Sequence, residues 1–322
     1  MPTRFLSAAD PGPSVLDKLA ALAPANPFAT AAYLGYRRQL GARPWALGVE
    51  SDEQLVSGCI AFMHVGHLNC RMEITSLPSL PHPDVFWRGL LELCARHRVS
   101  QLVVCSFGSM PTSIPQLPGE EYRQPRCEFI IDLKANDLGE HLTTHHRRLI
   151  ARARKRGLRL ERVADRSACD IHVSLIKASM QRREGRGEQV PNLQPSVELF
   201  AMTQSGVGEL FRAVTEEETV SSMMVLRSTR GGYMQSSGTS PLGMTCGASA
   251  WLVHHVARAL QSEGLELFNL GGAGPDEEGL RRFKAAFGTT PIELESASFF
   301  LGSPMKQAVT RAARRLRQAI GR

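Results

Sequence analysis

Residues 267–288 read LFNLGGAGPDEEGLRRFKAAFG and say more about the fold than any other stretch of the chain. The apolar start predicts a buried strand, and Gly271–Gly272 follow, where the backbone must bend or approach a ligand closely. Proline and acidic residues then open a short helix, which suits the positive end of the helix dipole. Taken alone, the pattern also fits an ordinary glycine turn before a solvated helix.

A second informative segment lies upstream, at 141–159 (HLTTHHRRLIARARKRGLR). Seven of the thirteen residues from Arg147 to Arg159 are basic. Like charges four residues apart on a helix, such as Arg148 and Arg152, repel each other, and a solvated surface usually mixes both signs. The pattern favours a site for a polyanion over an uncommitted basic surface.

Working outward, hydrophobic periodicity and turn residues predict the remaining elements. Helices are predicted at 15–24, 28–40, 84–98, 138–156, 167–184, 247–263 and 276–287. Strands are predicted at 45–50, 54–64, 69–75, 102–107, 127–133, 158–163, 208–215, 219–227, 231–236, 265–270 and 291–300. Each half therefore contains paired antiparallel strands, then a helix, then a buried strand, which predicts an α/β fold with mixed (α+β) sheets.

The length of 322 residues suits about two domains. The polar stretch at 134–138 predicts a boundary, which gives an N-terminal domain at 1–135, a catalytic domain at 136–303 and a basic C-terminal helix at 304–322. The last strand, 291–300, could also return to the sheet of the first domain.

Composition narrows the setting of the protein. The chain has no apolar run of the ~18–20 residues that a membrane span requires, and its first residues lack the apolar core of a signal peptide. We therefore expect a cytoplasmic protein. The net charge of +7 predicts partners that carry phosphate. The seven cysteines form no CxxC pair, so we expect reduced core cysteines and no metal site.

Four segments together resemble the FemA/FemX-type family of tandem GNAT-like acyltransferases. They are NPFATAAYLGYRRQLG (26–41), the strand and basic helix at 130–161, the long helix and glycine turn at 233–272, and GLRRFKAAFG (279–288). The last matches the family pattern G-L-x-x-F-K-x-x-F-G. The resemblance covers nearly the whole chain and implies two tandem GNAT-like domains.

The resemblance also implies site residues. Lys284 takes the place of the family lysine that lies near the reacting ester, where it would stabilise negative charge. Arg37 stands where the family has a phosphate-binding lysine, and an arginine can hold phosphate through two hydrogen bonds. The other implied substrate- or phosphate-binding residues are Arg147, Arg148, Gly271, Gly272 and Phe283. We expect the basic helix and the Phe283–Lys284 helix to face one cleft.

Three functions stay open at this stage. The first is an N-acyltransferase that uses acyl-CoA or a related thioester, and the second uses aminoacyl-tRNA and acts on a peptidoglycan precursor in cell-wall synthesis. The third is a non-catalytic module that binds a nucleotide or RNA. In the first two, an amine is the acceptor and no metal is required.

Some assignments remain alternatives. The loop RREGRG (182–187) fits a CoA pyrophosphate loop in composition but follows a helix, so 238–247, between a strand and a helix, is the better-placed candidate. The general base is unassigned among His145, His146, His254, His255 and Glu209. The basic helix at 305–322 could contact anionic lipid at the inner membrane face, or RNA, or only solvent.

Overall fold

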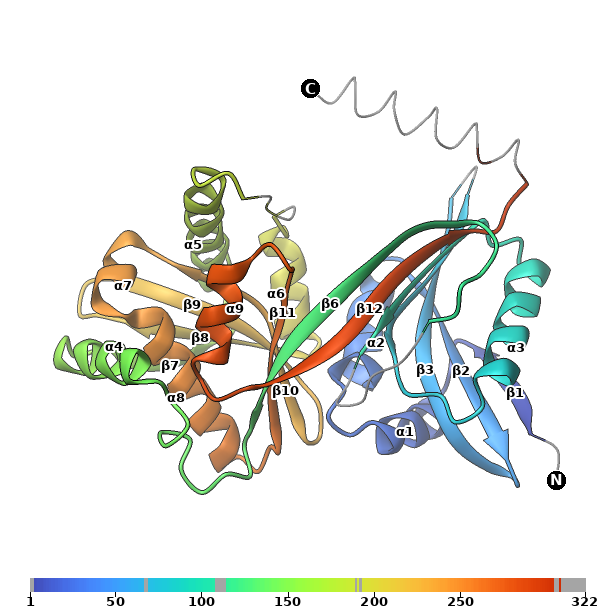
Figure 1. Cartoon of the computed structure of the whole chain (residues 1–322), viewed down its shortest axis with the longest axis horizontal. Helices are drawn as coiled ribbons and strands as arrows, with labels where there is room; N and C mark the ends of the chain where they lie inside the picture. The colour runs from blue at the N-terminus through green and yellow to red at the C-terminus, as the bar shows by residue number, and fades with distance from the viewer. Residues whose placement is uncertain are drawn as a thin grey trace. The chain divides into compact units, whose positions relative to one another are not determined.

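The computed structural model describes residues 3–66, 69–107, 114–188, 190, 193–303 and 307. The chain forms two compact units, each built from separate stretches of sequence (Figure 1). Unit 1 comprises 1–22, 40–125 and 294–322, and unit 2 comprises 23–39 and 126–293.

Unit 1 is a mixed sheet with the strand order β1-β2-β3-β4-β5-β12. The strands are β1 (Arg4–Ala9), β2 (Arg43–Ser51), β3 (Gln54–Val65), β4 (Cys70–Leu77), β5 (Gln101–Ser106) and the C-terminal part of β12 (Thr290–Phe300). β4 and β5 run parallel, and the other neighbours are antiparallel. The parallel pair requires a crossover, which α3 (Pro83–Arg96) supplies.

Two helices cover opposite faces of this sheet. Phe86 and Leu90 of α3 lie in the same apolar cluster as Cys59 of β3. On the other face, α1 (Pro13–Leu22) brings Leu19 against Gly58. Successive residues of a strand point to opposite faces, so the adjacent pair Gly58–Cys59 separates the two helices.

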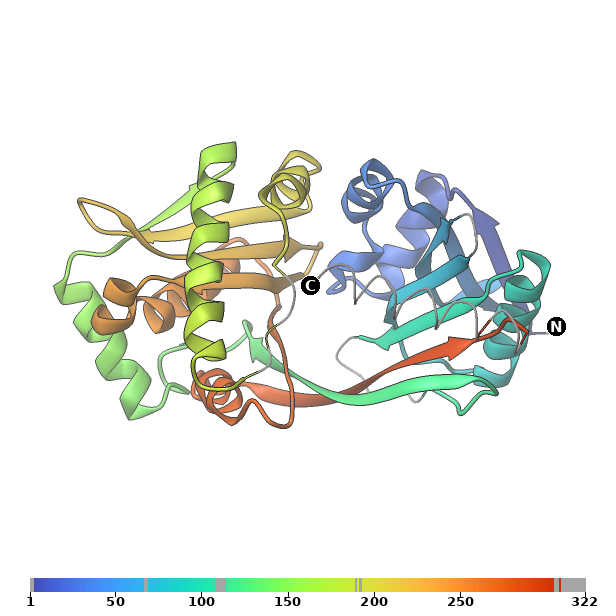
Figure 2. The ribbon, with the colours of Figure 1, turned by 90° about the horizontal axis from the view of Figure 1, so that it is seen from above.

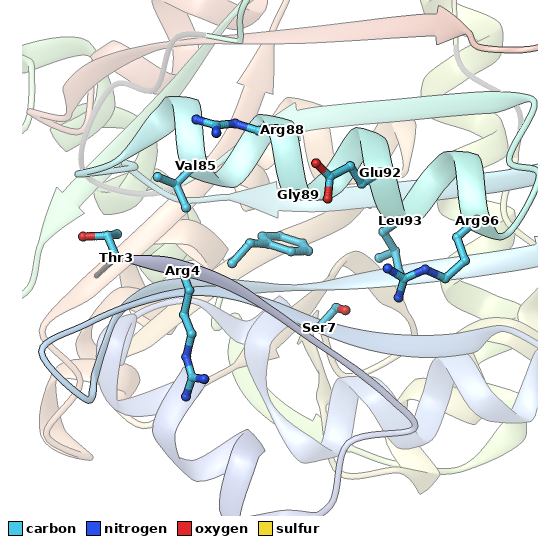
Figure 3. Close-up of a pocket in the computed structure, with 10 residues that line it drawn as sticks. Thr3, Arg4, Ser7, Val85, Arg88, Gly89, Glu92, Leu93 and Arg96 are labelled. Carbon is cyan, nitrogen blue, oxygen red and sulfur yellow. The ribbon is translucent and has the colours of Figure 1, made fainter. Parts of the chain in front are cut away.

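A close approach joins α3 to the edge strand β1. A Cβ at Gly89 would lie 2.2 Å from Cγ of the Phe5 ring, and that ring meets Phe86 edge-on at 5.7 Å. Figure 3 shows Val85, Gly89 and Leu93 on the side of α3 that faces β1, where a pocket of about 380 Å³ opens. Only glycine at 89 allows this packing.

Unit 2 is a second mixed sheet with the order β6-β11-β10-β9-β8-β7. Its strands are β6 (Glu120–Asp132), β7 (Arg159–Val163), β8 (Gly208–Val214), β9 (Thr219–Arg227), β10 (Gly231–Thr239) and β11 (Leu267–Ala273). Its helices are η1 (Pro27–Ala29), α2 (Ala31–Gln39), α4 (Thr144–Lys155), α5 (Arg166–Glu184), α6 (Ser196–Gln204), α7 (Pro241–Cys246), α8 (Ala248–Ser262) and α9 (Glu278–Ala285). β10 and β11 are parallel, and the helices α7 and α8 connect them.

The helices of unit 2 also lie on both faces of the sheet. α5 crosses the strands on one face (Figure 2), and its Ile176 N would lie 2.4 Å from a Cβ at Gly238 of β10. On the other face, Leu260 of α8 would lie 2.8 Å from a Cβ at Gly232. Within the described residues, no helix combines the length and apolar character that a bilayer crossing requires.

The predicted fold class is confirmed, but the compact units differ from the predicted domains 1–135 and 136–303. Residues 23–39 belong to unit 2, because Arg230 N–H donates to Pro24 O at 2.9 Å and the Phe28 ring meets Tyr233 at 5.1 Å. β6 and β12 each contribute residues to both units, so the last strand does return to the first sheet.

Several elements differ from the sequence prediction. The basic helix begins at Thr144 rather than at 138, because the side chain of Thr143 caps it by accepting the His146 N–H. β1, α6 and α7 were not predicted. The predicted C-terminal helix at 304–322 lies outside the described residues, apart from Gln307.

The contact at Gly89 is testable. The change Gly89→Ala should lower the free energy of unfolding by about 1–3 kcal/mol, because its methyl group overlaps the Phe5 ring. The matched helix-interior control, Gly35→Ala in α2, has open space around it and should be neutral or stabilising by up to about 1 kcal/mol. Urea unfolding would measure both, and equal effects of the two substitutions would contradict the assigned packing.

Candidate active site

The strands β10 and β11 are paired over a short distance only. Gly231, Gly232 and Tyr233 pair with Leu267, Phe268 and Asn269, and the register ends there. Beyond this point β10 continues with β9 and β11 continues with β6. Backbone groups on the facing edges of the two diverging strands then need other partners, which makes this end of the pair suitable for a ligand.

A β-bulge shapes β11 at this point. The register with β6 moves from Asn269↔Ile130 to Gly272↔Glu128, which leaves one extra residue in β11. Gly271 has a φ of 71°, in the left-handed region that glycine adopts without strain. The Asn269 side chain stabilises the bulge, since its Oδ1 accepts the Gly271 N–H at 2.8 Å.

The same asparagine binds a buried carboxylate. Asn269 Nδ2 donates to Glu128 Oε2 at 2.7 Å, and Arg126 Nη2 lies 2.6 Å from Glu128 Oε1. Glu128 is fully buried in β6. Burial raises the pKa of its carboxyl group, and the nearby charge of Arg126 and the Asn269 hydrogen bond oppose that rise. A glutamate buried in the core of a sheet needs a charged or hydrogen-bonding partner, and such a residue marks a candidate functional position.

Lys284 of α9 lies beside this carboxylate. Its side chain is 3% exposed, and its Nζ donates to the carbonyl oxygen of Gly272 at 2.7 Å. Burial lowers the pKa of Lys284 to about 8, because the charged form loses its hydration, while the charges of Glu128 and Glu277 act to raise it. Gly272 itself is exposed, so the ammonium group is held next to backbone that solvent reaches.

The start of α9 is tied to α5. Glu277 Oε2 accepts the Gly274 N–H at 2.6 Å, and its other oxygen accepts from Arg183. Arg183 also donates to Glu188 Oε2 at 2.7 Å. The basic segment at 182–187 begins within the last turn of α5, and Arg183 in that turn holds α9 through Glu277 instead of lying open.

A chain of aromatic rings extends from the glycine turn to Arg37. A Cβ at Gly271 would lie 3.6 Å from the Tyr233 hydroxyl and 3.8 Å from Lys284 Nζ. The Tyr233 ring meets Phe28 at 5.1 Å, and Phe28 meets Tyr33 at 5.0 Å. Arg37 Nη1 donates to the Tyr33 hydroxyl at 3.1 Å. These contacts place Arg37, the glycine turn and Lys284 in one connected region of unit 2.

Comparison with known protein families finds one match, within unit 2. The family described as Acetyltransferase (GNAT) domain matches residues 142–285. These residues of unit 2 match a GNAT domain model. Its parallel pair β10–β11, the crossover helix α8 and the Lys284 region all lie within or beside the matched residues.

Solved structures show that the GNAT domain is part of a tandem fold. FemX superposes with a TM-score of 0.69 at 12% identity, over 94% of this chain and 99% of FemX. The C-terminal domain of a putative lysylphosphatidylglycerol synthetase from Agrobacterium fabrum gives 0.55 at 14% identity, over 93% and 96%. A tandem GNAT protein from the clavulanic acid biosynthesis pathway gives 0.54 at 13% identity, over 94% and 99%. No curated protein matches the sequence. The predicted FemX-like tandem GNAT fold is confirmed.

The predicted site residues lie in two separate groups. Arg37, Gly271, Gly272 and Lys284 belong to the region described above. Arg147 instead lines a pocket of about 440 Å³ between α4 and α8, and Lys284 is not part of its described lining. The expectation that the basic helix and Lys284 face one cleft stays a prediction, because this pocket contains Arg147 without Lys284.

The remaining predicted residues sit near the basic helix. Arg148 is exposed on α4. The Phe283 ring packs against His146 of α4, at 5.1 Å between centroids, and helps to anchor α9 in the core. Phe283 thus positions Lys284 from the interior.

The structure also places the candidates for a general base. His146 is buried among Phe283 and Phe287, which lowers its pKa to about 4. Glu209 is paired with Arg227 at 3.0 Å, and His254 and His255 line the α4–α8 pocket. Of these candidates, none is a partner of Lys284 among the contacts of the described residues.

The segment 238–247 does not form the open phosphate cradle that its position suggested. Residues 241–246 form α7, and Gly247 joins it to α8. A Cβ at Gly247 would lie 2.7 Å from Leu149 O of α4, and Ala248 is fully buried. Arg152 Nη1 also donates to Thr245 O at 3.2 Å. Helix α4 therefore covers the start of α8.

The cysteines are reduced, as the sequence predicted. All seven cysteines are free thiols, and burial raises the pKa of Cys59 and Cys94 to about 12. In the portion of the chain that the structure describes, no group of three or more histidine, cysteine, aspartate or glutamate side chains is arranged to hold a metal ion.

The electrostatics of Lys284 can be measured directly. In a lysine-labelled NMR titration, the Lys284 side chain should titrate near pH 8, well below the ordinary lysine value. Replacing Glu128 with glutamine should lower that pKa further, because the carboxylate stabilises the ammonium group. The control Glu278→Gln removes an exposed carboxylate from the same helix and should leave the titration in place. A Lys284 pKa of 10 or above would contradict the burial assigned to it.

Proposed function

We propose that this protein transfers an acyl or aminoacyl group from an activated donor to an amine, at the open end of β10 and β11. The observation that carries the proposal is the buried Lys284 ammonium group, held 2.7 Å from the Gly272 carbonyl oxygen where the two parallel strands separate. A fixed cation in a water-poor site stabilises negative charge far better than the same cation in water.

The chemistry follows from this placement. The acceptor nitrogen attacks the donor carbonyl carbon, and the carbonyl oxygen becomes an oxyanion. Lys284 Nζ has three N–H donors, of which the Gly272 carbonyl oxygen takes one. A remaining N–H can donate to the oxyanion. The C–S bond of a thioester, or the C–O bond of an aminoacyl ester, then breaks, and the amine proton leaves with the thiol or hydroxyl product.

Arg37 supplies the second part of the proposal. It lies on α2 beside Tyr33, in the same region of unit 2 as Lys284, and the Tyr33 hydroxyl accepts from its guanidinium group. An arginine in this position can hold a donor or acceptor phosphate. Binding energy from the phosphate would then position the reacting groups against Lys284.

One observation keeps an aminoacyl-tRNA donor as the second candidate. A CoA pyrophosphate is commonly held by backbone N–H groups at the start of a helix, but α4 covers the start of α8 here. Among the similar structures, the tandem GNAT protein is described in a form without AcCoA, which supports acyl-CoA as a candidate donor. We therefore keep acyl-CoA as the first donor to test and charged tRNA as the second.

Substitution of Lys284 tests the proposal. With a panel of acyl-CoAs, charged tRNAs and amines, Lys284→Met should lower kcat by about 10²–10³ for whichever donor is used. The control Arg282→Met alters an exposed cation on the same helix and should keep turnover within about twofold, given how little exposed pairs contribute. Full turnover by the Lys284→Met protein would rule out the proposed role. Ligand binding without turnover by any donor would favour the non-catalytic alternative.

The pH dependence offers a separate test. If the ammonium form is the active one, kcat should fall as the pH rises through about 8, where Lys284 loses its proton. In Lys284→Arg the guanidinium group stays charged, so any activity that this variant retains should show no such fall near pH 8. An identical descending limb in both proteins would assign that limb to another group.

A further inference from the structure

The pocket between α4 and α8 has features that the proposed transferase site does not use. It lies within unit 2, has a volume of about 440 Å³ and is lined by one face of each helix. On α4 the lining residues are Arg147, Ile150, Ala151 and Arg154, at the spacing of a single helical face. A volume in this range is typical of small-molecule sites.

The arginines of this pocket are not neutralised. Elsewhere in the described chain, arginines such as Arg123, Arg183 and Arg227 each lie within ion-pair distance of glutamates. Arg154 and Arg258, by contrast, make no ion pair among the described residues, and both are exposed at the pocket. The lining holds three arginines against two acids, Asp137 and Glu140, and this excess of positive charge favours an anionic ligand.

Arg147 forms no ion pair with a carboxylate among the described residues, and backbone hydrogen bonds fix the orientation of its side chain. Its Nε donates to Leu142 O at 3.0 Å and its Nη2 donates to Glu140 O at 3.2 Å. Backbone carbonyls fix the guanidinium group without cancelling its charge. Of the two acids in the lining, Asp137 accepts the Gly139 N–H at 2.7 Å, and neither acid forms an ion pair within the described part of the chain.

The other side of the pocket carries a ring stack. His255 lies on Trp251 with centroids 3.9 Å apart and an interplanar angle of 22°. Its Nδ1 lies 2.8 Å from Trp251 O, and since a carbonyl oxygen only accepts, Nδ1 carries the proton. Burial lowers the pKa of His255, which favours the neutral form of the ring. Its Nε2 is then an acceptor, with no partner among the described residues.

We propose that the α4–α8 pocket binds a nucleotide, with the phosphate on Arg147, Arg154 and Arg258 and the base against His255 and Ile150. The arginines match the phosphate oxygens, and the apolar part of the lining, Leu142, Ile150 and Ala151, matches the ring of the base. The open His255 Nε2 can accept a hydrogen bond from an amino group on that ring. This site is separate from Lys284 and does not rest on the transferase activity.

The experiment uses adenosine 5′-monophosphate (AMP) as the probe, with calorimetry and NMR as readouts. Of the three tryptophans, Trp45 and Trp87 belong to unit 1 and Trp251 to unit 2. We expect AMP to shift the Trp251 indole signal and leave the other two unchanged. Adenosine and inorganic phosphate should each bind at least about tenfold more weakly than AMP, because each lacks one half of the ligand.

Variants test the arginines. The double variant Arg154→Gln/Arg258→Gln should weaken AMP binding at least about tenfold, with the free Trp251 signal unchanged as evidence of folding. The matched control Arg156→Gln removes an exposed charge from the end of α4, outside the pocket lining, and should change binding by less than about twofold. Lys284→Met should bind AMP normally, which separates this site from the transferase site.

The probe also distinguishes a free nucleotide from an RNA end. A tetra-adenylate that binds more tightly than AMP, and is weakened by the same double variant, would identify RNA as the source of the nucleotide. Three outcomes would overturn the proposal. They are AMP binding that the double variant does not weaken, an AMP-induced signal change at Trp45 or Trp87 instead of Trp251, and no binding of either probe at millimolar concentration.

Discussion

Unit 2 depends on how a fully buried carboxylate is compensated. An ionised glutamate in an apolar sheet is costly unless charge and hydrogen bonds surround it. Arg126 and Asn269 satisfy the two oxygens of Glu128, and the Lys284 ammonium group adds a second positive charge nearby. The carboxylate in turn keeps the buried lysine charged near neutral pH. Each of these groups would be unfavourable without the others, so the site and the interior of the sheet stabilise one another.

The backbone next to this cluster is held in place by the same side chains. The bulge in β11 gives Gly271 its left-handed conformation, and Asn269 satisfies the N–H that the bulge releases. The same asparagine binds Glu128, so one side chain couples the turn to the buried charge. As β10 leaves β11 at this level, a rigid, polar strand end remains beside Lys284. A preorganised cation of this kind needs little rearrangement when charge develops on a substrate.

Local patterns predicted most elements, but not the way the parts assemble. Periodicity located most of the helices and strands, and the match of residues 279–288 to the family pattern singled out Lys284. Helix α7 was missed although Ser240 and Pro241 carry the signals of a helix start, because its six residues are too few for periodicity. Glu128 was also missed, although a glutamate inside the apolar run CEFIID is a signal in itself. The placement of Arg147 in the pocket between α4 and α8 depends on helix packing that sequence spacing does not encode.

The interleaving of the two units bears on how the chain is made. Unit 1 needs residues from 294 onward to complete its sheet, and unit 2 takes residues 23–39 from within the first part of the chain. When residues 1–125 have emerged from the ribosome, the sheet of unit 1 still lacks its last strand, β12. Helix α2 has also emerged by then, but the rest of unit 2 has not yet been synthesised. Neither half can reach its final form during translation until the residues of β12 have emerged, which ties the maturation of one half to that of the other.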